Sequence, residues 1–224
     1  MIICMKKLIF ITILTIYSIS INAQLDINYG IKTGLNYNSY GSLSIYFYEP
    51  SITPSIIAQS ERDFGFHVGM YAQLNITKLY IRPELLFSKN KSTYNYPVLG
   101  GFSTTAEFKL SMYEIPVLVG FRIIKPISLY IGPTFQHIID YKFQYGVDNK
   151  FPSEVDLNLE NDFVLGLNVG VALQLQKFGF DLRYSRGLSE NLAVDFSTIP
   201  ADGWGYSIDT KSDQIIFSFS YQIN

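Results

Sequence analysis

The chain has very little cysteine, histidine and tryptophan. Its 224 residues include one cysteine, Cys4, together with two histidines and one tryptophan. After Cys4 there is no thiol left to form a disulfide bond, so the stability of an exported chain would need another source. No cluster of residues has the spacing of metal ligands, and no glycine-rich phosphate loop leads from a strand into a helix. We therefore expect no metal site and no cofactor.

Long apolar runs and an excess of positive charge are also missing after residue 23. The formal net charge is −2, which argues against a nucleic-acid partner because such proteins usually carry a basic patch. No apolar run in this part of the chain reaches the roughly 20 residues that a membrane-spanning helix needs. If the mature chain lies in a membrane, it must cross it as a closed β-barrel, in which every backbone polar group is paired.

The first 23 residues have the organisation of a secretory signal peptide. Lys6 and Lys7 precede an apolar run from Leu8 to about Ile21, and the small residue Ala23 follows. This predicts export and cleavage between Ala23 and Gln24, which leaves one domain over residues 24–224. An N-terminal membrane anchor is the alternative, although the apolar run is short for a spanning helix.

The clearest pattern in the chain runs from Phe64 to Ser88. Apolar side chains alternate with small or polar ones over 64–76, a short turn follows at Thr77 and Lys78, and the alternation resumes over 79–88. Strand side chains point to opposite faces in turn, so this pattern predicts a hairpin of two long strands with one apolar face. Strands of about eleven residues suit a tilted crossing of a bilayer.

Six other segments alternate in the same way. Strands are predicted over 27–37, 109–122, 127–139, 161–175, 178–187 and 213–224. Tight turns join three pairs of strands, and four long segments that read as loops join the rest, over 38–63, 89–108, 141–160 and 191–209.

Eight strands with alternating tight and long connections predict an all-β fold, an eight-stranded antiparallel up-and-down transmembrane β-barrel. Such barrels have short periplasmic turns and long outer loops, and their narrow interior suits glycine and short polar residues. A soluble barrel or sandwich is the alternative, but its apolar residues would face inward. The high share of aromatic residues, 16%, agrees with strands and membrane interfaces.

Several segments in this order resemble the PorT-like outer-membrane β-barrel proteins of Gram-negative bacteria. They are the signal peptide ending near Ala23, GIKTGLN at 30–36, LYIRPELLFS at 79–88, YEIPVLVGFR at 113–122, ISLYIGPTF at 127–135 and FDLRYSRGL at 180–188.

The resemblance implies a fold and an outer-membrane location, with outer-membrane lipid and the barrel-assembly machinery as partners. Some relatives are associated with a secretion and gliding apparatus, and most have no defined role. Many such barrels end on an aromatic residue, whereas this chain ends on Tyr221, Gln222, Ile223 and Asn224. Recognition by the assembly machinery would then depend on a less typical final strand.

Charged residues occur on the parity predicted to face the barrel interior. They balance in sign and could pair, as charges removed from water must. We interpret them as a network that closes the lumen, with a gated polar path or a ligand site as the alternative. The network is predicted to contain Arg82, Glu84, Glu114, Arg122, Asp181 and Arg183.

Catalysis has few residues to use. A lipid hydrolase or acyltransferase would need a histidine base beside a nucleophile and an orienting carboxylate. His67 has inward parity with Asp63 close by, but no nucleophile motif accompanies it, and His137 has lipid-facing parity. We expect no catalytic residues.

Aromatic residues gather in or beside the predicted outer loops. They would form either a recognition surface for a protein partner or ligand, or the interfacial girdle common to such barrels. The sequence thus favours a structural or binding role through the outer loops, with a small channel or transport component and a lipid-modifying enzyme as alternatives. The residues are Tyr37, Tyr40, Tyr46, Tyr48, Tyr94, Tyr96, Tyr141, Tyr145, Trp204 and Tyr206.

Overall fold

Eight strands close into a ring. The computed structural model describes residues 26–47, 56–97, 103–145, 153–155, 163–188, 193–195, 204–209 and 211–224. Within these ranges no helix is long and apolar enough to cross a membrane. The ring strands are β1 (Asp26–Tyr40), β4 (Asp63–Ile76), β5 (Leu79–Pro97), β6 (Ser103–Ile124), β7 (Ile127–Tyr145), β9 (Phe163–Leu175), β10 (Phe178–Gly187) and β13 (Ser212–Gln222).

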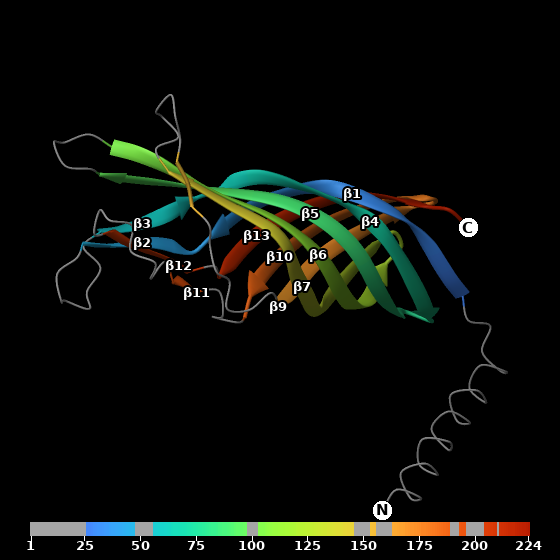
Figure 1. Ribbon diagram of the computed structural model, residues 1–224. Helices are drawn as coiled ribbons and strands as arrows, with labels where there is room; N and C mark the ends of the chain where they lie inside the picture. The colour runs from blue at the N-terminus through green and yellow to red at the C-terminus, as the bar shows by residue number, and fades with distance from the viewer. Residues whose placement is uncertain are drawn as a thin grey trace, which may run out of the picture.

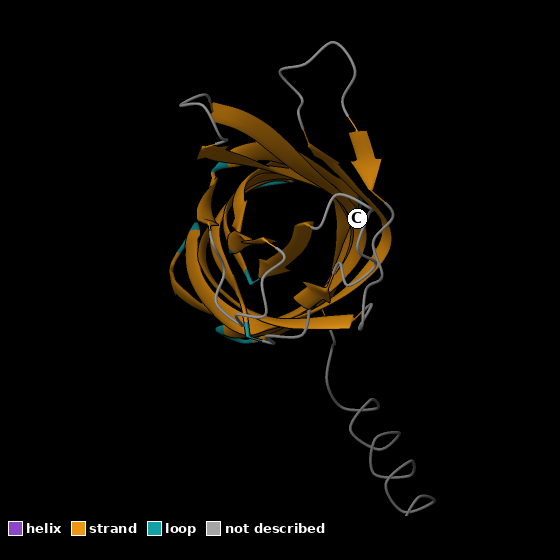
Figure 2. Cartoon of the chain, turned by 60° about the vertical axis from the view of Figure 1, so that its left-hand side comes forward, coloured by secondary structure: helices purple, strands orange, loops and turns teal. Residues whose placement is uncertain are grey.

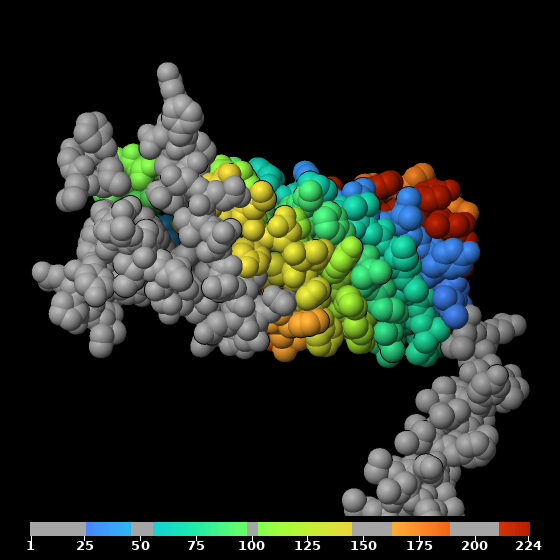
Figure 3. Space-filling model, viewed as in Figure 1, coloured from blue at the N-terminus to red at the C-terminus, as the bar shows by residue number. Residues whose placement is uncertain are grey.

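Each ring strand pairs antiparallel with its neighbours along the chain. The ring closes where β1 pairs with β13, for example Thr33 opposite Phe219. Figure 2 shows the closed wall, and in Figure 3 the side chains of neighbouring strands are in continuous contact on the face in view. Closure leaves the membrane part of the sheet without an open edge. The predicted eight-stranded up-and-down β-barrel is confirmed, whereas the predicted signal peptide lies outside the described residues.

The two ends of the barrel differ. Tight turns at 77–78, 125–126 and 176–177 lie at one end, which we call the turn end, and the C-terminus lies there too (Figure 1). Thr77 and Gln176 have φ values of 54° and 53°, a left-handed conformation that reverses the chain within two residues. The opposite end, the loop end, carries five further short strands.

These five strands correct the prediction of four long loops. β2 (Ser42–Phe47) pairs with β3 (Ile56–Glu61) and with β12 (Trp204–Asp209), and β11 (Ala193–Asp195) pairs with β12. β8 (Ser153–Val155) pairs with β7. The hairpin of β5 and β6 continues without a break to Pro97 and Ser103. We call this outer part of the sheet the loop-end extension (Figure 1).

Strand lengths explain the extension. β6 has 22 residues and β5 and β7 have 19 each, whereas a tilted strand crosses a bilayer in about 9–11 residues. About half of each of these strands therefore lies beyond the membrane. The loop prediction for 89–108 failed because the polarity pattern changes there, although the strand continues.

The outward face of the membrane part is apolar, as predicted. On β9 the residues from Phe163 to Leu175 with outward parity are exposed except Leu173, which is half-buried; Leu167, for example, is 40% exposed and Val169 is 49% exposed. On β5 the same holds for Leu79, Ile81 and Leu85. An exposed apolar surface of this extent is far larger than a monomer tolerates in water and marks contact with lipid.

Polarity inverts in the loop-end extension. On β6, Tyr113 and Ile115 face outward in the membrane part. Farther toward the loop end the exposed outward residue is Lys109, and its neighbour Phe108 is fully buried. On β5 the change falls between Phe87 and Lys89, which is exposed. Beyond the lipid the outer surface meets water, so the apolar residues of the same strands turn to the inside.

Candidate functional site

Five charged side chains meet at the middle of the barrel interior. Two carboxylates, Glu84 and Asp181, lie among three cations. Glu84 is within 2.9 Å of Lys32 Nζ, 3.0 Å of Arg82 Nε and 2.8 Å of Arg183 Nη2. Asp181 lies 2.9 Å from Arg82 Nη2 and 3.4 Å from Lys32 Nζ. We call these five residues the charge cluster, and its geometry satisfies the demand that buried charges be paired.

The cluster is closed to solvent except at Arg82, whose side chain is 10% exposed. The side chains of Lys32, Glu84 and Arg183 are at most 2% exposed. The Tyr130 ring covers both guanidinium groups, with its centroid 5.1 Å from Arg82 Cζ and 5.5 Å from Arg183 Cζ. Such cation–π contacts are strongest when desolvated. The cluster therefore occupies the middle of the lumen as a packed unit.

Glycine makes room for the tyrosines around the cluster. A Cβ atom at Gly170 would lie 2.5 Å from Tyr130 Cζ, and one at Gly120 would lie 2.0 Å from Tyr80 Cζ. Both distances are too short for any side chain, so the two tyrosines pack directly against the glycine backbone of the neighbouring strand. The narrow interior of an eight-stranded barrel can hold large rings only with such partners.

The structure joins four of the six predicted network residues and separates two. Arg82, Glu84, Asp181 and Arg183 belong to the charge cluster. Glu114 is buried nearer the loop end, where it accepts hydrogen bonds from Ser88 Oγ and from Gln136 Nε2, the latter at 3.0 Å. Glu114 therefore lies apart from the ion pairs, and neutral donors satisfy its carboxylate.

Arg122 is the other exception, since it lies at the turn end. Its guanidinium donates to Asn75 Oδ1 and to the carbonyl of Thr77. Sequence reasoning missed Lys32, which takes part in two ion pairs. The signal was present, because Lys32 shares the inward parity of β1 with Gly30 and Gly34.

A neutral hydrogen-bonded layer lies next to the cluster toward the loop end. His67 Nδ1 is 2.7 Å from Asn36 Oδ1, and His67 Nε2 is 3.1 Å from Ser218 Oγ. Asn36 Nδ2 also donates to Asn90 Oδ1 at 3.0 Å. The Ser218–His67–Asn36 arrangement has the order of nucleophile, base and orienting group that hydrolases use.

Packing closes this arrangement to substrates. Ser218 and His67 are each 1% exposed, and Asn36 is fully buried. A Cβ at Gly34 would lie 2.6 Å from His67 Cε1 and 2.8 Å from Ser218 Cα, so the backbone of β1 rests directly on both residues. His137 faces outward and stacks on Phe163 with ring centroids 4.6 Å apart, which matches its predicted lipid-facing parity.

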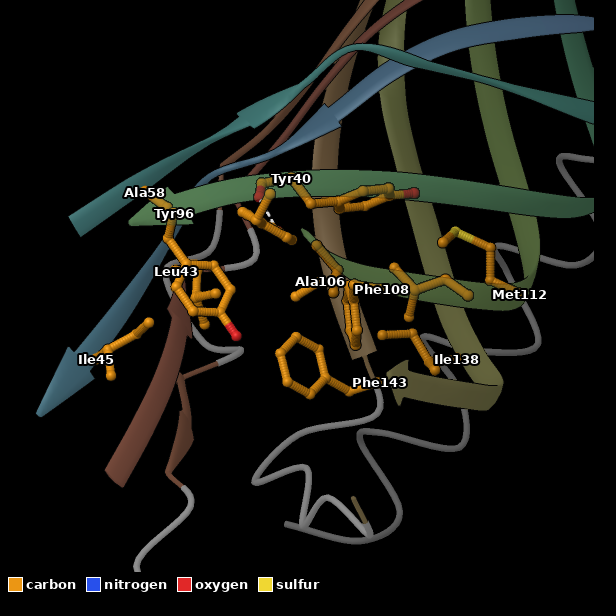
Figure 4. Packing of buried hydrophobic residues seen from close by; sticks show 13 residues of the cluster. Tyr40, Leu43, Ile45, Ala58, Tyr96, Ala106, Phe108, Met112, Ile138 and Phe143 are labelled. Atoms are coloured by element: carbon orange, nitrogen blue, oxygen red, sulfur yellow. Dashed lines mark hydrogen bonds between the residues drawn. The ribbon is translucent and has the colours of Figure 1, made fainter. Parts of the chain in front are cut away.

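The loop end is filled by an apolar core (Figure 4). Phe108 and Phe143 are fully buried there beside Leu43 and Ile45 of β2. Three residues predicted for a recognition surface or an aromatic girdle belong to this core. That prediction is wrong for Tyr40, Tyr94 and Tyr96, which are 0–4% exposed, because the inverted polarity of the extension turns them inward. Tyr37, on the membrane part, is exposed and contacts Phe64 with the two rings tilted and their centroids 5.0 Å apart, whereas Tyr48 lies outside the described residues.

Ion pairs on the outside of the extension complete its inverted pattern. Glu107 lies 3.1 Å from Lys91 Nζ and 2.9 Å from Lys109 Nζ. Partial burial alone would raise the pKa of the Glu107 carboxyl, but the hydrogen bonds and charges of the two lysines outweigh burial and lower it. Water-facing charges on both strands mark this surface as lying beyond the lipid.

The turn end holds a cavity of about 230 Å³. Arg82 and Tyr80 lie at its inner side, and Arg122, Ile124 and Lys125 lie toward the exposed turn. Among the described residues no group of three histidine, cysteine, aspartate or glutamate side chains could hold a metal ion. The interior thus has three parts along its axis: an open cationic cavity, a closed polar middle and an apolar core.

Comparison with solved structures finds other outer-membrane proteins of similar fold. The structure is similar to that of the outer membrane protein OprG from Pseudomonas aeruginosa, with a TM-score of 0.53, 12% identity, and coverage of 88% of this chain and 96% of that one. It is also similar to Ail of Yersinia pestis (TM-score 0.43, 14% identity, 88% and 99% covered) and to Neisserial surface protein A (0.43, 12%, 86% and 96%).

The sequence comparisons supply the family. No curated protein matches the chain. A family model described as the outer membrane protein beta-barrel domain matches residues 22–193, which is most of the chain. That match agrees with the lipid-facing surface and the closed ring of strands. The chain belongs to the outer membrane protein beta-barrel domain family, and it is an outer-membrane β-barrel protein.

Proposed function

We propose that this protein is a plugged outer-membrane barrel with a structural or binding role, which it performs through the loop-end extension on the cell exterior. One observation carries the proposal. The charge cluster and the apolar core fill the middle and the loop end of the interior, while the loop end builds additional strands that a simple pore would not need. The surface of the extension is then the part offered to a partner or ligand.

The direction of the barrel and its route to the membrane belong to the same proposal. A signal peptide over residues 1–23 would direct export and be removed, and the barrel-assembly machinery would insert the barrel. An even number of strands puts both ends of the domain on one side, and the tight turns on that side are typical of the periplasmic end. The extension would then face outward.

A PorT-like role is the finer form of the proposal. The segments over 79–88 and 113–122, which carry the resemblance, lie in the paired strands β5 and β6, and the first of them contributes Arg82 and Glu84 to the charge cluster. In that role the extension would contact a component of a secretion apparatus.

Photo-crosslinking tests the binding role. Ile57 on β3 is 59% exposed in the extension, and Leu79 is 49% exposed on the lipid-facing wall. A benzophenone amino acid at position 57 is expected to give a discrete protein adduct in intact cells, whereas the same group at position 79 should react with lipid. An adduct at both positions, or at neither, would count against a partner at the extension.

A small channel is the first alternative, and the charged lumen favours it. Conduction would need a continuous wet path past Glu84 and Arg183, which are almost fully buried. Steady ion-selective current through the purified protein in a planar bilayer would support the channel and reject the plugged barrel.

A lipid-modifying enzyme is the second alternative, and the Ser218–His67–Asn36 arrangement favours it. An active serine would react with a fluorophosphonate probe, and Ser218→Ala would abolish the labelling. We expect no labelling of the folded barrel, because Ser218 is packed under the β1 backbone.

A further inference from the structure

The turn-end cavity combines positive charge with an absence of carboxylates. Its lining includes Arg82, Arg122 and Lys125, and none of the residues that line it is acidic. Guanidinium groups in a partly enclosed space are the usual means of holding a carboxylate or phosphate, because they offer several donors in one plane.

Arg122 supplies a cation without an ionic partner. Its guanidinium donates only to neutral oxygens, those of the Asn75 side chain and the Thr77 carbonyl. The nearest acidic group in this network is Asp26, and Asn75 lies between it and Arg122. Asn75 Nδ2 donates to Asp26 Oδ2 at 3.0 Å, while Asn75 Oδ1 accepts from Arg122. Within the described part of the chain, Arg122 forms no salt bridge.

Arg82 supplies positive charge from the inner side. The charge cluster contains three cations and two carboxylates, so it carries an excess of one positive charge. Leu118 of β6 lies opposite Arg82 of β5. The third buried carboxylate, Glu114, lies four residues from Leu118 along β6. Glu114 is therefore displaced toward the loop end, and Arg82 is the cluster member that lines the cavity.

The neutral lining is suited to hydroxyl groups of a ligand. Gln73, Gln174 and Gln222 each donate through Nε2 to a protein oxygen, at 2.7–2.8 Å, which leaves their carbonyl oxygens available as acceptors. The Tyr80 hydroxyl is buried beside the cavity and has no hydrogen-bond partner within the described residues. A buried hydroxyl without a partner is uncommon and is satisfied when a ligand supplies one.

We propose that the turn-end cavity binds a small organic anion that carries a carboxylate and hydroxyl groups, of the size and kind of a sugar acid. The carboxylate is placed between Arg82 and Arg122, and the hydroxyl groups contact the glutamine carbonyls. This site lies at the opposite end of the barrel from the extension, so its existence does not depend on the role proposed for the extension.

Titration of the full-length barrel in lipid nanodiscs tests the site. The probes are D-glucuronate and D-glucose, which share a ring and differ in one carboxylate. Calorimetry is expected to show glucuronate binding at least about tenfold tighter than glucose, the effect of one charge-assisted hydrogen bond. Amide NMR shifts should move at the turn end and stay unchanged in the extension.

Two variants that each remove one positive charge from the turn end separate the site from general attraction. Arg122→Gln removes a lining cation and should weaken glucuronate binding by at least about tenfold. Lys78→Gln removes an exposed cation from the neighbouring turn that does not line the cavity, and it should change binding by less than about twofold. Equal weakening by the two variants, equal affinity for both sugars, or no binding of glucuronate would overturn the proposal.

Discussion

The membrane part and the loop-end extension of the same strands are built with opposite polarity. In the membrane part apolar residues face outward and the interior holds charges, whereas in the extension charges face outward and the interior holds Phe108 and Phe143. The backbone of β6 is continuous through both parts. The comparison shows that the solvent outside the wall, lipid or water, decides what can fill the space inside.

The consequences for stability differ as well. The middle of the barrel depends on electrostatic pairing, which is costly to break when one partner is lost. The extension depends on apolar burial, which weakens in proportion to the volume removed. Single substitutions should therefore affect the two parts separately, and each part has its own reporter. The only tryptophan, Trp204, belongs to β12 in the extension, and we expect the shift in gel mobility on heating to report on the membrane part.

Glu84→Gln should have the largest effect. It leaves three buried cations with Asp181 as their only anionic partner, so we expect a loss of about 3–5 kcal/mol in the free energy of unfolding of the membrane part. Urea titration followed by gel mobility measures it. Glu107→Gln is the matched control, because the same change at a surface ion pair should cost about 0–1 kcal/mol.

Phe108→Ala should act on the extension alone. It empties a fully buried position in the apolar core, and the local free energy of unfolding should fall by about 3–5 kcal/mol. The urea transition of Trp204 fluorescence should shift while the gel-mobility transition stays in place. A joint shift of both transitions would mean that the two parts unfold as one unit.

Leu167→Arg tests the lipid-facing side of the comparison. Leu167 is 40% exposed on the outer wall near the centre of β9, and an arginine near the midplane should cost about 2–4 kcal/mol. Phe163→Arg, at the end of the same strand, should cost only about 0–1 kcal/mol. Refolding into lipid vesicles with urea titration gives both values, and a variant Leu167→Arg as stable as the parent would refute the outward facing.

Acid should loosen the extension slightly. The pKa of Glu107 is lowered in the folded chain, so its contribution to stability is present above its unfolded pKa and is lost as the pH falls through the lower folded value. The urea midpoint of Trp204 fluorescence should therefore fall below about pH 4.5, where a glutamate begins to take up protons. Glu107→Gln should show a smaller fall over the same range, and an equal fall would exclude this carboxylate as a cause.

Alternation was sufficient to predict the membrane part from the sequence. Lipid on one side and a narrow lumen on the other require every strand to place apolar residues outward and small or polar residues inward. The outward positions of β4, β5 and β9 could therefore be predicted directly from the sequence. The same rule concealed the extension. At residues 105–112 polar and apolar residues still alternate, but with the opposite parity. A search for outward apolar residues therefore predicts a loop there.

The interior could be predicted only in part. Inward parity indicates which charges enter the lumen, and it pointed to Glu84 and Arg183, which the structure places in the charge cluster. Parity does not predict where along the barrel axis a lumen side chain lies, because strand tilt and register determine that position. For this reason Glu114 and Arg122 were grouped with charges that lie at another level, and Lys32, from a strand far away in sequence, was left out.

The central claim is that the charge cluster and the apolar core close the barrel. Planar-bilayer recording of the purified full-length protein at neutral pH tests this claim most directly. We predict no steady current above that of protein-free bilayers. A steady, ion-selective current at every insertion event would contradict the claim.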